Sequence, residues 1–212
     1  MGYRLLIFDF DGTLADSALW FANVLNDVAG RYGFRQIGVD EMAELRGRPN
    51  REIIRRLGVP AWKMPFIAAH FRQLAAEAAP DLKLFPGVEN MLRRLAAGGV
   101  KIAVVSSNSE ATVREVLGAE LSGLIAHYGC GASVFGKAPK FRAVIRKAGV
   151  AEADVLCVGD EVRDIEAARK AHLATGAVTW GYATPQILRA QRPSVVFETP
   201  GDILHEAGLC GI

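Results

Sequence analysis

The chain has 212 residues, 50% of them hydrophobic, so it can bury a sizeable core as one large domain or two small ones. Its formal net charge is +2, whereas a dedicated nucleic-acid-binding domain is usually strongly basic, so nucleic acid is not expected as a partner. The sequence contains no run of about 18 apolar residues, which argues against a membrane span.

The N-terminal segment does not fit a secretory signal, because the acidic Asp9 and Asp11 follow a short apolar run almost at once. The cysteines are odd in number and widely spaced, at Cys130, Cys157 and Cys210. This spacing favours neither a disulfide framework nor a zinc site. We therefore expect a cytoplasmic protein, with Cys157 as a small buried core residue.

Three apolar runs have the length and β-branched content of buried parallel strands, namely Arg4–Phe10, Val100–Val105 and Val155–Gly159. A polar or glycine-rich turn and then a helical pattern follow each of them. Weaker strand patterns occur at Ala174–Thr179 and Val195–Phe197. This alternation predicts an α/β fold, a Rossmann-like, doubly wound parallel sheet with helices on both faces.

The segment from residue 16 to residue 85 holds no convincing strand, and its apolar residues recur at helical spacing. Helices are expected there at about 17–32, 40–45, 50–58 and 61–78, and later in the chain at Val88–Ala97, Phe141–Ala148 and Gly201–Ala207. Pro86-Gly87 ends the helical segment before strands and helices alternate again. We therefore expect residues 1–15 and 86–212 to form the α/β core and residues 16–85 to be an inserted α-helical domain.

Two carboxylates lie at the end of the first predicted strand, in the run Asp9-Phe10-Asp11-Gly12-Thr13. Because side chains alternate along a strand, Asp9 and Asp11 should leave the same face. Two carboxylates so close repel each other unless a cation or a shared proton compensates. Ligands of open α/β sheets bind beyond the carboxyl ends of the strands, which favours a site here. A solvated turn or a helix cap is the alternative for an isolated Asp-x-Asp pair.

Polar side chains also follow the other two strong strands. Ser106, Ser107 and Asn108 supply hydroxyl and amide groups after the second strand. Asp160 and Asp164 follow the third strand, and their spacing of four would place them on one face of a helix that began there. Their alternative role is that of acids favoured at a helix N-terminus.

The turn before the helix at Phe141–Ala148 contains Lys137 and Lys140, which are either site cations or solvated surface lysines. In a parallel sheet, these acidic, hydroxyl and cationic groups would converge on one crevice. Oxygen ligands suit Mg²⁺, and lysine with hydroxyl groups suits phosphate oxygens. The combination favours a site for a hard cation and a phosphate.

Four ordered motifs resemble those of the haloacid dehalogenase superfamily: FDFDGTLADS, VVSSNS, the lysine of GKAPK and VGDEVRDIEAA. They span nearly the whole chain, and the helical insertion resembles the small cap of that family. The acid two residues after the first aspartate and the GDxxxD element resemble its phosphatase and phosphomutase branch, because the dehalogenating members lack that acid and use no metal. Many relatives have Lys-Pro-x-Pro in the third motif, so the departure to GKAPK leaves Lys140 as a rival to Lys137.

The resemblance implies a Mg²⁺-dependent phosphatase that acts on a small phosphomonoester. Asp9 would be the nucleophile that forms an aspartyl-phosphate, and Asp11 would be the general acid and base. Ser106 and Lys137 would hold phosphoryl oxygens as charge shifts in the transition state.

The same resemblance implies a set of metal ligands and supporting residues. Mg²⁺ would be bound by Asp9, Asp160 and the backbone carbonyl of Asp11. Asp164 would support the metal or Lys137, and Thr13 would brace Asp11. The connections Ala15-Asp16 and Phe85-Pro86 are expected hinges for closure of the cap.

An arginine-rich run interrupts the helical insertion, and its position resembles that of the cap loop that faces the active site in related phosphatases. Arginine binds carboxylate or phosphate bidentately, so this run could contact a second anionic group of a small phosphorylated acid, such as phosphoglycolate, or of a sugar phosphate. A solvated helix face partly neutralised by Glu52 explains the run equally well. The candidate substrate-binding residues are Thr13, Ser107, Asn108, Arg46, Gly47, Arg48 and Arg51.

Other functions remain open at this stage. A phosphomutase of the β-phosphoglucomutase type would share every catalytic residue but return the phosphoryl group to a bound intermediate. A non-catalytic binding protein is disfavoured by the intact Asp9, Asp11, Lys137 and Asp160. A haloacid dehalogenase is a more distant alternative. The sequence identifies neither the physiological substrate nor whether the protein is a monomer or a homodimer.

Overall fold

The computed structural model describes residues 2–38, 41, 44–45, 48, 50–132 and 136–209, apart from the side chains of residues 50 and 51. Its strands are β1 (Leu5–Phe8), β2 (Lys101–Val104), β3 (Ile125–Tyr128), β4 (Val155–Gly159), β5 (Ala174–Val178) and β6 (Val195–Phe197). They form a six-stranded sheet in the order β3-β2-β1-β4-β5-β6, and each adjacent pair is parallel. The predicted doubly wound parallel sheet is confirmed.

Strand β1 lies at the centre of the sheet, where the direction in which strands are added reverses. Leu5 pairs with Lys101 of β2 on one side and with Val155 of β4 on the other. The Asp9 N–H donates to the carbonyl of Val158 at 2.8 Å, so the ladder continues one residue beyond β1. The crevice in which such sheets bind ligands therefore opens beside Asp9.

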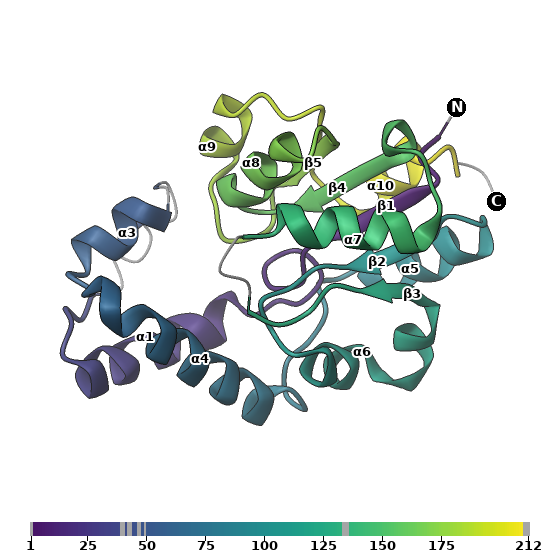
Figure 1. The fold of residues 1–212 in the computed structure, drawn as a ribbon. Coiled ribbons are helices and arrows are strands. Elements are labelled where there is room, and N and C mark those ends of the chain that lie inside the picture. Colours follow the sequence, from purple (N-terminus) through teal and green to yellow (C-terminus); the bar gives the residue numbers. More distant parts are fainter. Residues whose placement is uncertain are drawn as a thin grey trace.

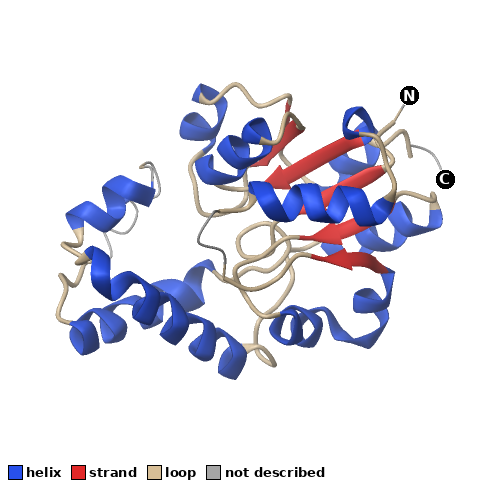
Figure 2. Ribbon diagram, viewed as in Figure 1, coloured by secondary structure: helices blue, strands red, loops and turns tan. Residues whose placement is uncertain are grey.

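Helices cover both faces of the sheet, as Figures 1 and 2 show. Their bounds are α5 (Val88–Ala97), α6 (Glu110–Leu124), α7 (Ala138–Ala148), α8 (Val162–Lys170), α9 (Pro185–Ala190) and α10 (Pro200–Glu206), with a short 3₁₀ turn at Glu152–Asp154. Leu6 and Phe8 pack among residues of α5, α6 and α10, whereas Leu5 and Ile7 pack among residues of α7 and α8. The alternation of β1 side chains thus supplies both layers of the core. Within the described ranges, no helix combines the length and apolar character needed to cross a bilayer.

Strand β3 was not predicted. Its sequence Ile-Ala-His-Tyr is short, and of these residues Ile125 is buried whereas the others are exposed or half-buried. It follows α6 directly and lies at the edge of the sheet, so neither a turn signal nor a continuous apolar run marks it. The strand predicted at Arg4–Phe10 is shorter than expected, because its last residues already belong to the turn that carries the site.

A separate group of helices occupies the lower left of Figure 1. It comprises α1 (Ala18–Tyr32), α3 (Asn50–Arg56), the 3₁₀ turn η1 (Ala61–Lys63) and α4 (Met64–Ala78). Leu25, Val28 and Ile67 belong to a hydrophobic cluster of its own, distinct from those at the sheet. The helices predicted at 17–32, 50–58 and 61–78 are confirmed, with bounds that differ by a few residues. Of the helix predicted at 40–45, residues 41, 44 and 45 are helical, and the other three lie outside the described residues.

Two connections join this helical segment to the sheet, and they run side by side. Ala15 and Leu84 form an antiparallel bridge. The Asp16 N–H donates to the Lys83 carbonyl at 2.8 Å, and the Phe85 N–H donates to the Leu14 carbonyl at 3.0 Å. The expected domain boundaries at residues 15–16 and 85–86 coincide with these paired connections, and the division into two domains stays a prediction.

The described cysteines, Cys130 and Cys157, are both free. Cys157 is buried in β4, which confirms its predicted place in the core. Cys210 lies outside the described residues.

Candidate active site

The turn after β1 brings two carboxylates to the carboxyl edge of the sheet. The N–H groups of Leu14 and Ala15 both donate to the Phe10 carbonyl at 2.9 Å, which closes a tight turn around Gly12. Gly12 has a φ of 75°, a conformation that strains other residues. A Cβ atom at this position would lie 2.2 Å from Asp160 Oδ2. Glycine therefore allows the turn to approach the loop after β4.

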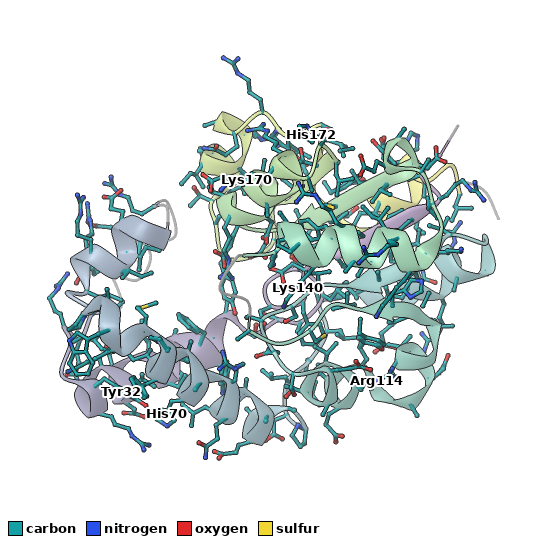
Figure 3. The ribbon with its side chains drawn as sticks, in the orientation of Figure 1. Tyr32, His70, Arg114, Lys140, Lys170 and His172 are labelled. Carbon is teal, nitrogen blue, oxygen red and sulfur yellow. The ribbon has the colours of Figure 1, made fainter. Side chains whose placement is uncertain are left out.

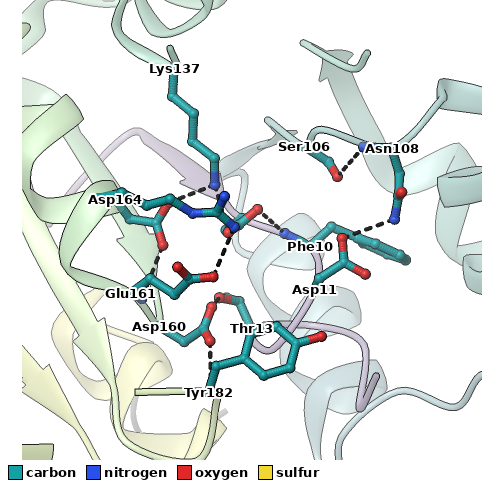
Figure 4. A network of polar contacts seen from close by, with 12 residues as sticks. Phe10, Asp11, Thr13, Ser106, Asn108, Lys137, Asp160, Glu161, Asp164 and Tyr182 are labelled. Carbon is teal, nitrogen blue, oxygen red and sulfur yellow. Dashed lines mark hydrogen bonds and ion pairs between the residues drawn. The ribbon is translucent and has the colours of Figure 1, made fainter. Parts of the chain in front are cut away.

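Three acids form a buried cluster at this edge, and they come from the turn after β1, the loop after β4 and the first turn of α8. One carboxylate oxygen each from Asp9, Asp160 and Asp164 lies within 4.8 Å of the others. The Lys137 Nζ atom lies 2.6 Å from Asp9 Oδ2 and 2.6 Å from Asp164 Oδ1, and Figure 4 shows the second of these contacts. The sequence predicted that these residues would meet at the sheet edge, and the structure brings them together.

Burial dominates the electrostatics of this cluster. It raises the pKa of Asp9 to about 7, against the opposing effect of Lys137. Burial also raises the pKa of Asp160 well above its ordinary value, and the neighbouring Glu161 and Asp9 add to this effect. Burial alone would lower the pKa of Lys137, but Asp164 and Asp9 outweigh it and raise that pKa. Burial thus disfavours the ionised forms of Asp9 and Asp160 even with Lys137 beside them, and a further cation would favour those forms.

The donor set fits a hard divalent cation. Asp9 Oδ2 is buried and accepts no well-aligned hydrogen bond from the described residues, although the Lys137 ammonium lies beside it. Three carboxylates within one small volume offer the oxygen ligands that Mg²⁺ prefers. The Asp11 side chain does not belong to this group of acids, so its predicted contribution to the metal would come through its backbone carbonyl.

Asp11 is instead held by side chains from two other parts of the chain. The Asn108 amide donates to Asp11 Oδ2 at 2.9 Å, and the Ser17 hydroxyl donates to Asp11 Oδ1 at 3.2 Å. The Ser17 Oγ atom also lies 2.7 Å from the Tyr182 hydroxyl. Partial burial raises the pKa of Asp11, an effect that the hydrogen bond from Ser17 opposes. Asn108 was predicted to bind substrate, and the structure shows it in contact with Asp11, the predicted general acid and base.

Thr13 corrects one expectation. Its hydroxyl donates to Asp160 Oδ1 at 2.9 Å and not to Asp11 (Figure 4). The tight turn at Gly12 carries Thr13 toward the loop after β4, which the linear sequence did not reveal. The predicted brace for Asp11 is therefore wrong, and Thr13 positions Asp160.

Tyr182 and Ser17 were missed by the sequence reasoning. The Tyr182 N–H donates to Asp160 Oδ2 at 2.7 Å, so this residue links the acidic cluster to Asp11 through Ser17. The Tyr182 ring also lies 6.1 Å from the Phe21 ring of α1, measured between centroids. Ser17 lies within the first motif and could have been noticed there, whereas no pattern marks Tyr182.

The loop after β2 is ordered around Ser106. This residue is buried, and its Oγ atom accepts a hydrogen bond from the Asn108 N–H at 3.0 Å. Ser107 is exposed. Lys140, labelled in Figure 3, donates to the Ser106 carbonyl at 2.9 Å and to the Gly131 carbonyl. Of the two rival lysines, Lys137 contacts the carboxylates and Lys140 supports the backbone of this loop.

The start of α8 fixes the positions of Glu161 and Asp164. Glu161 is the N-cap residue, and it shares a reciprocal capping box with Asp164, whose Oδ2 accepts a hydrogen bond from the Glu161 N–H at 3.1 Å. The helix begins at Val162, so Asp160 precedes it and does not share a helix face with Asp164; the spacing implied a shared face only for a helix that began at Asp160. The two acids converge because Asp160 lies on the loop and Asp164 points back toward it.

The arginine-rich run of the helical segment is described in part. Arg46 and Gly47 lie outside the described residues, as does the Arg51 side chain. Arg48 NH1 lies 3.3 Å from Glu52 Oε1, which is the neutralisation expected for a solvated helix face. Its proposed contact with substrate stays a prediction.

Comparison with known proteins places the chain among phosphate-ester hydrolases. A family model described as haloacid dehalogenase-like hydrolase matches residues 6–178. A phosphoglycolate phosphatase from Synechococcus elongatus is 34% identical over 203 residues, which cover 95% of this chain and 96% of that protein. A haloacid dehalogenase-like family hydrolase from Streptococcus pneumoniae has a similar fold, with a TM-score of 0.79 at 18% identity over 96% of this chain and 97% of that one. A Clostridium acetobutylicum structure described as a predicted phosphatase aligns with a TM-score of 0.80 at 20% identity over 99% of each chain.

The two lysines should differ in their effect on stability. Lys137→Met would leave Asp9 and Asp164 buried without their cation, so the free energy of unfolding in the presence of EDTA should fall by about 3–5 kcal/mol. Lys140→Met removes hydrogen bonds to two carbonyls and should cost about 1–2 kcal/mol. Urea unfolding followed by circular dichroism measures both. Equal losses for the two variants would contradict the assignment of Lys137 to the acidic cluster.

Proposed function

This chain belongs to the haloacid dehalogenase-like hydrolase family and is a phosphatase, and we propose that it hydrolyses a small phosphomonoester with Mg²⁺ through an aspartyl-phosphate on Asp9. The observation that carries the proposal is the cluster of Asp9, Asp160 and Asp164 around the Lys137 ammonium. It supplies a nucleophile, oxygen ligands for a hard cation and a fixed positive charge for phosphoryl oxygens.

In this proposal Asp9, Asp160 and the Asp11 backbone carbonyl would bind Mg²⁺, with Asp164 beside them. When bound, Mg²⁺ would stabilise negative charge on a phosphoryl oxygen and reduce the repulsion between Asp9 and the anionic substrate. Thr13 and the Tyr182 N–H orient Asp160 through hydrogen bonds to its two oxygens. Preorganised ligands of this kind lower the cost of assembling the site.

The reaction proceeds in two steps. A carboxylate oxygen of Asp9 bonds to phosphorus while the ester P–O bond breaks, and Asp11 donates a proton to the departing oxygen. Asp11 then takes a proton from a water molecule whose oxygen attacks the aspartyl-phosphate, which releases inorganic phosphate and restores Asp9. Ser106 and Lys137 hold phosphoryl oxygens in both steps. The raised pKa of Asp11 favours the protonated form that the first step needs.

The helical segment of residues 16–85 would act as a cap. Its first helix begins directly after Ser17, and the Phe21 ring of that helix faces Tyr182 beside the site. The paired connections at Ala15 and Leu84 provide a short link about which the segment could rotate. Closure would exclude bulk water from the aspartyl-phosphate.

The substrate is proposed to be a small phosphorylated acid of the phosphoglycolate type. The similar protein from Synechococcus elongatus is a phosphoglycolate phosphatase, and the similarity extends over nearly all of both chains. The expected cytoplasmic location and the choice between monomer and homodimer stay predictions.

Phosphate release tests the proposed function. We expect the purified protein to release inorganic phosphate from phosphoglycolate with Mg²⁺, to lose this activity in EDTA and to regain it when Mg²⁺ is restored. Sugar phosphates, nucleotides and phosphoamino acids serve as comparison substrates. The proposal fails if no phosphoester is hydrolysed with Mg²⁺ present, or if glucose phosphates are isomerised without phosphate release.

Asp11→Asn should separate chemistry from folding. The variant lacks the proposed acid and base, so kcat should fall by about 10²–10⁴-fold. Far-ultraviolet circular dichroism and Mg²⁺ affinity by titration calorimetry should stay close to those of the unmodified protein. The control is Asp27→Asn, which changes an exposed acid of α1. A kcat within twofold of the unmodified value would exclude Asp11 from proton transfer.

Tyr182→Phe should lower kcat with little effect on KM. The substitution removes the hydroxyl that contacts Ser17 and keeps the ring near Phe21. Loss of one hydrogen bond that positions the acid should reduce kcat by about 2–10-fold. Tyr128→Phe is a matched control, because the Tyr128 hydroxyl donates to the Ser122 carbonyl at 2.9 Å on the edge strand. Equal kcat values for the two variants would show that the Tyr182 hydroxyl does not act on Asp11.

A further inference from the structure

A cavity of about 260 Å³ lies between the loop after β2, the start of α7 and one face of α8. Ser106 and Lys137, the proposed ligands of the phosphoryl group, line one side of it. Arg163, Glu166 and Lys170 of α8 line the other side. Their spacing of three and four residues places them on a single helix face. The cavity thus borders two proposed ligands of the phosphoryl group and follows α8.

The charged side chains that line this cavity are mostly positive, and they differ in the groups that they contact. Lys137 is paired with Asp9 and Asp164. Lys140, which also lines the cavity, donates to backbone carbonyls. Lys137 is already assigned to the phosphoryl group and Lys140 is held by the backbone, so a cation of this cavity that contacts another part of the substrate would come from α8.

Arg163 is the cation of this wall that lies within electrostatic range of the reacting groups. Its charge lowers the pKa of both Asp9 and Asp11, against the larger and opposite effect of their burial. Its NH2 group lies 2.8 Å from Glu161 Oε1, and the side chain is 48% exposed. A guanidinium has five N–H donors in a planar fork, so one contact with Glu161 leaves donors for a ligand.

Lys170 lies seven residues further along α8, which corresponds to about 10 Å of helix. It therefore lines the outer part of the cavity, while Arg163 is nearer to the acidic cluster. A small molecule whose phosphoryl group contacts Ser106 and Lys137 would bring a neighbouring group to Arg163 before it could reach Lys170.

We propose that Arg163 binds a carboxylate of the substrate, so that the enzyme selects phosphomonoesters that carry a carboxylate close to the phosphate. The planar fork of arginine matches the geometry of a carboxylate. This inference rests on the proposed function and adds a specificity-determining residue to it. A purely structural ion pair with Glu161 is the competing explanation, and it makes no distinction between substrates.

The test compares phosphoglycolate with 2-hydroxyethyl phosphate, which replaces the carboxylate by a neutral hydroxymethyl group. For Arg163→Gln, we expect KM for phosphoglycolate to rise by about 10–100-fold, because a charged hydrogen-bonded contact is lost. KM for 2-hydroxyethyl phosphate should change by less than about threefold. Any change in kcat that follows from loss of the Arg163 charge near Asp9 and Asp11 should be the same for both substrates. Arg163→Lys should recover part of the selectivity, because it keeps the charge and loses the fork.

The matched control is Arg189→Gln, which breaks another arginine–glutamate pair, Arg189 with Glu198 at 2.9 Å. Arg189 does not line the cavity, so both KM values should be unchanged. The proposal is overturned if Arg163→Gln raises KM equally for the two substrates, which would indicate action on the phosphoryl group or on the fold. It is also overturned if neither substrate is affected.

A binding measurement separates this inference from the proposed function. Titration calorimetry of Asp9→Asn and of the double variant Asp9→Asn/Arg163→Gln with both phosphoesters needs no turnover. The inference predicts weaker binding of phosphoglycolate alone in the double variant. If the unmodified protein releases no phosphate but this difference is found, the proposed hydrolysis fails and the carboxylate site stands. If phosphate is released and the difference is absent, the carboxylate site fails and the phosphatase proposal stands.

Discussion

The contact of one ammonium with two buried carboxylates organises this molecule. Lys137 lies 2.6 Å from both Asp9 and Asp164, and Asp160 adds a third acid within the same small volume. Burying acids without compensation is costly in a low-dielectric interior. Lys137 offsets part of this cost, and a bound hard cation would offset more of it. The same contacts of Lys137 with Asp9 and Asp164 therefore stabilise the sheet edge and place a positive charge where the phosphoryl group is proposed to bind.

The sheet topology makes this contact possible. β1 lies between β2 and β4, so the turn with Asp9 lies beside the loops that carry Ser106 and Asp160. Lys137 immediately precedes α7, whose other residues pack on the face of the sheet that holds Leu5 and Ile7. Parallel strands place all their carboxyl ends at one edge, and short loops then suffice to bring these groups together.

Asp11 belongs to a second network that reaches beyond the sheet. Asn108 contacts it from the loop after β2, and Ser17 contacts it from the start of the helical segment. Tyr182 joins the two networks, because its N–H contacts Asp160 and its hydroxyl contacts Ser17. The proposed nucleophile is thus held by the sheet, whereas the proposed acid and base is held partly by the helices that would cover it.

Local patterns in the chain determined the three strong strands, the helical insertion and the acids at the strand ends, because burial periodicity and the parallel-sheet edge rule act over a few residues. The half-exposed edge strand β3 escaped them, since its burial depends on neighbours distant in sequence. Which lysine meets the acids, why Thr13 contacts Asp160, and how Tyr182 reaches Ser17 were decided by the tertiary structure alone. Each of these contacts joins segments at least 27 residues apart, where the side chains meet because the loops converge and not because of any spacing in the sequence.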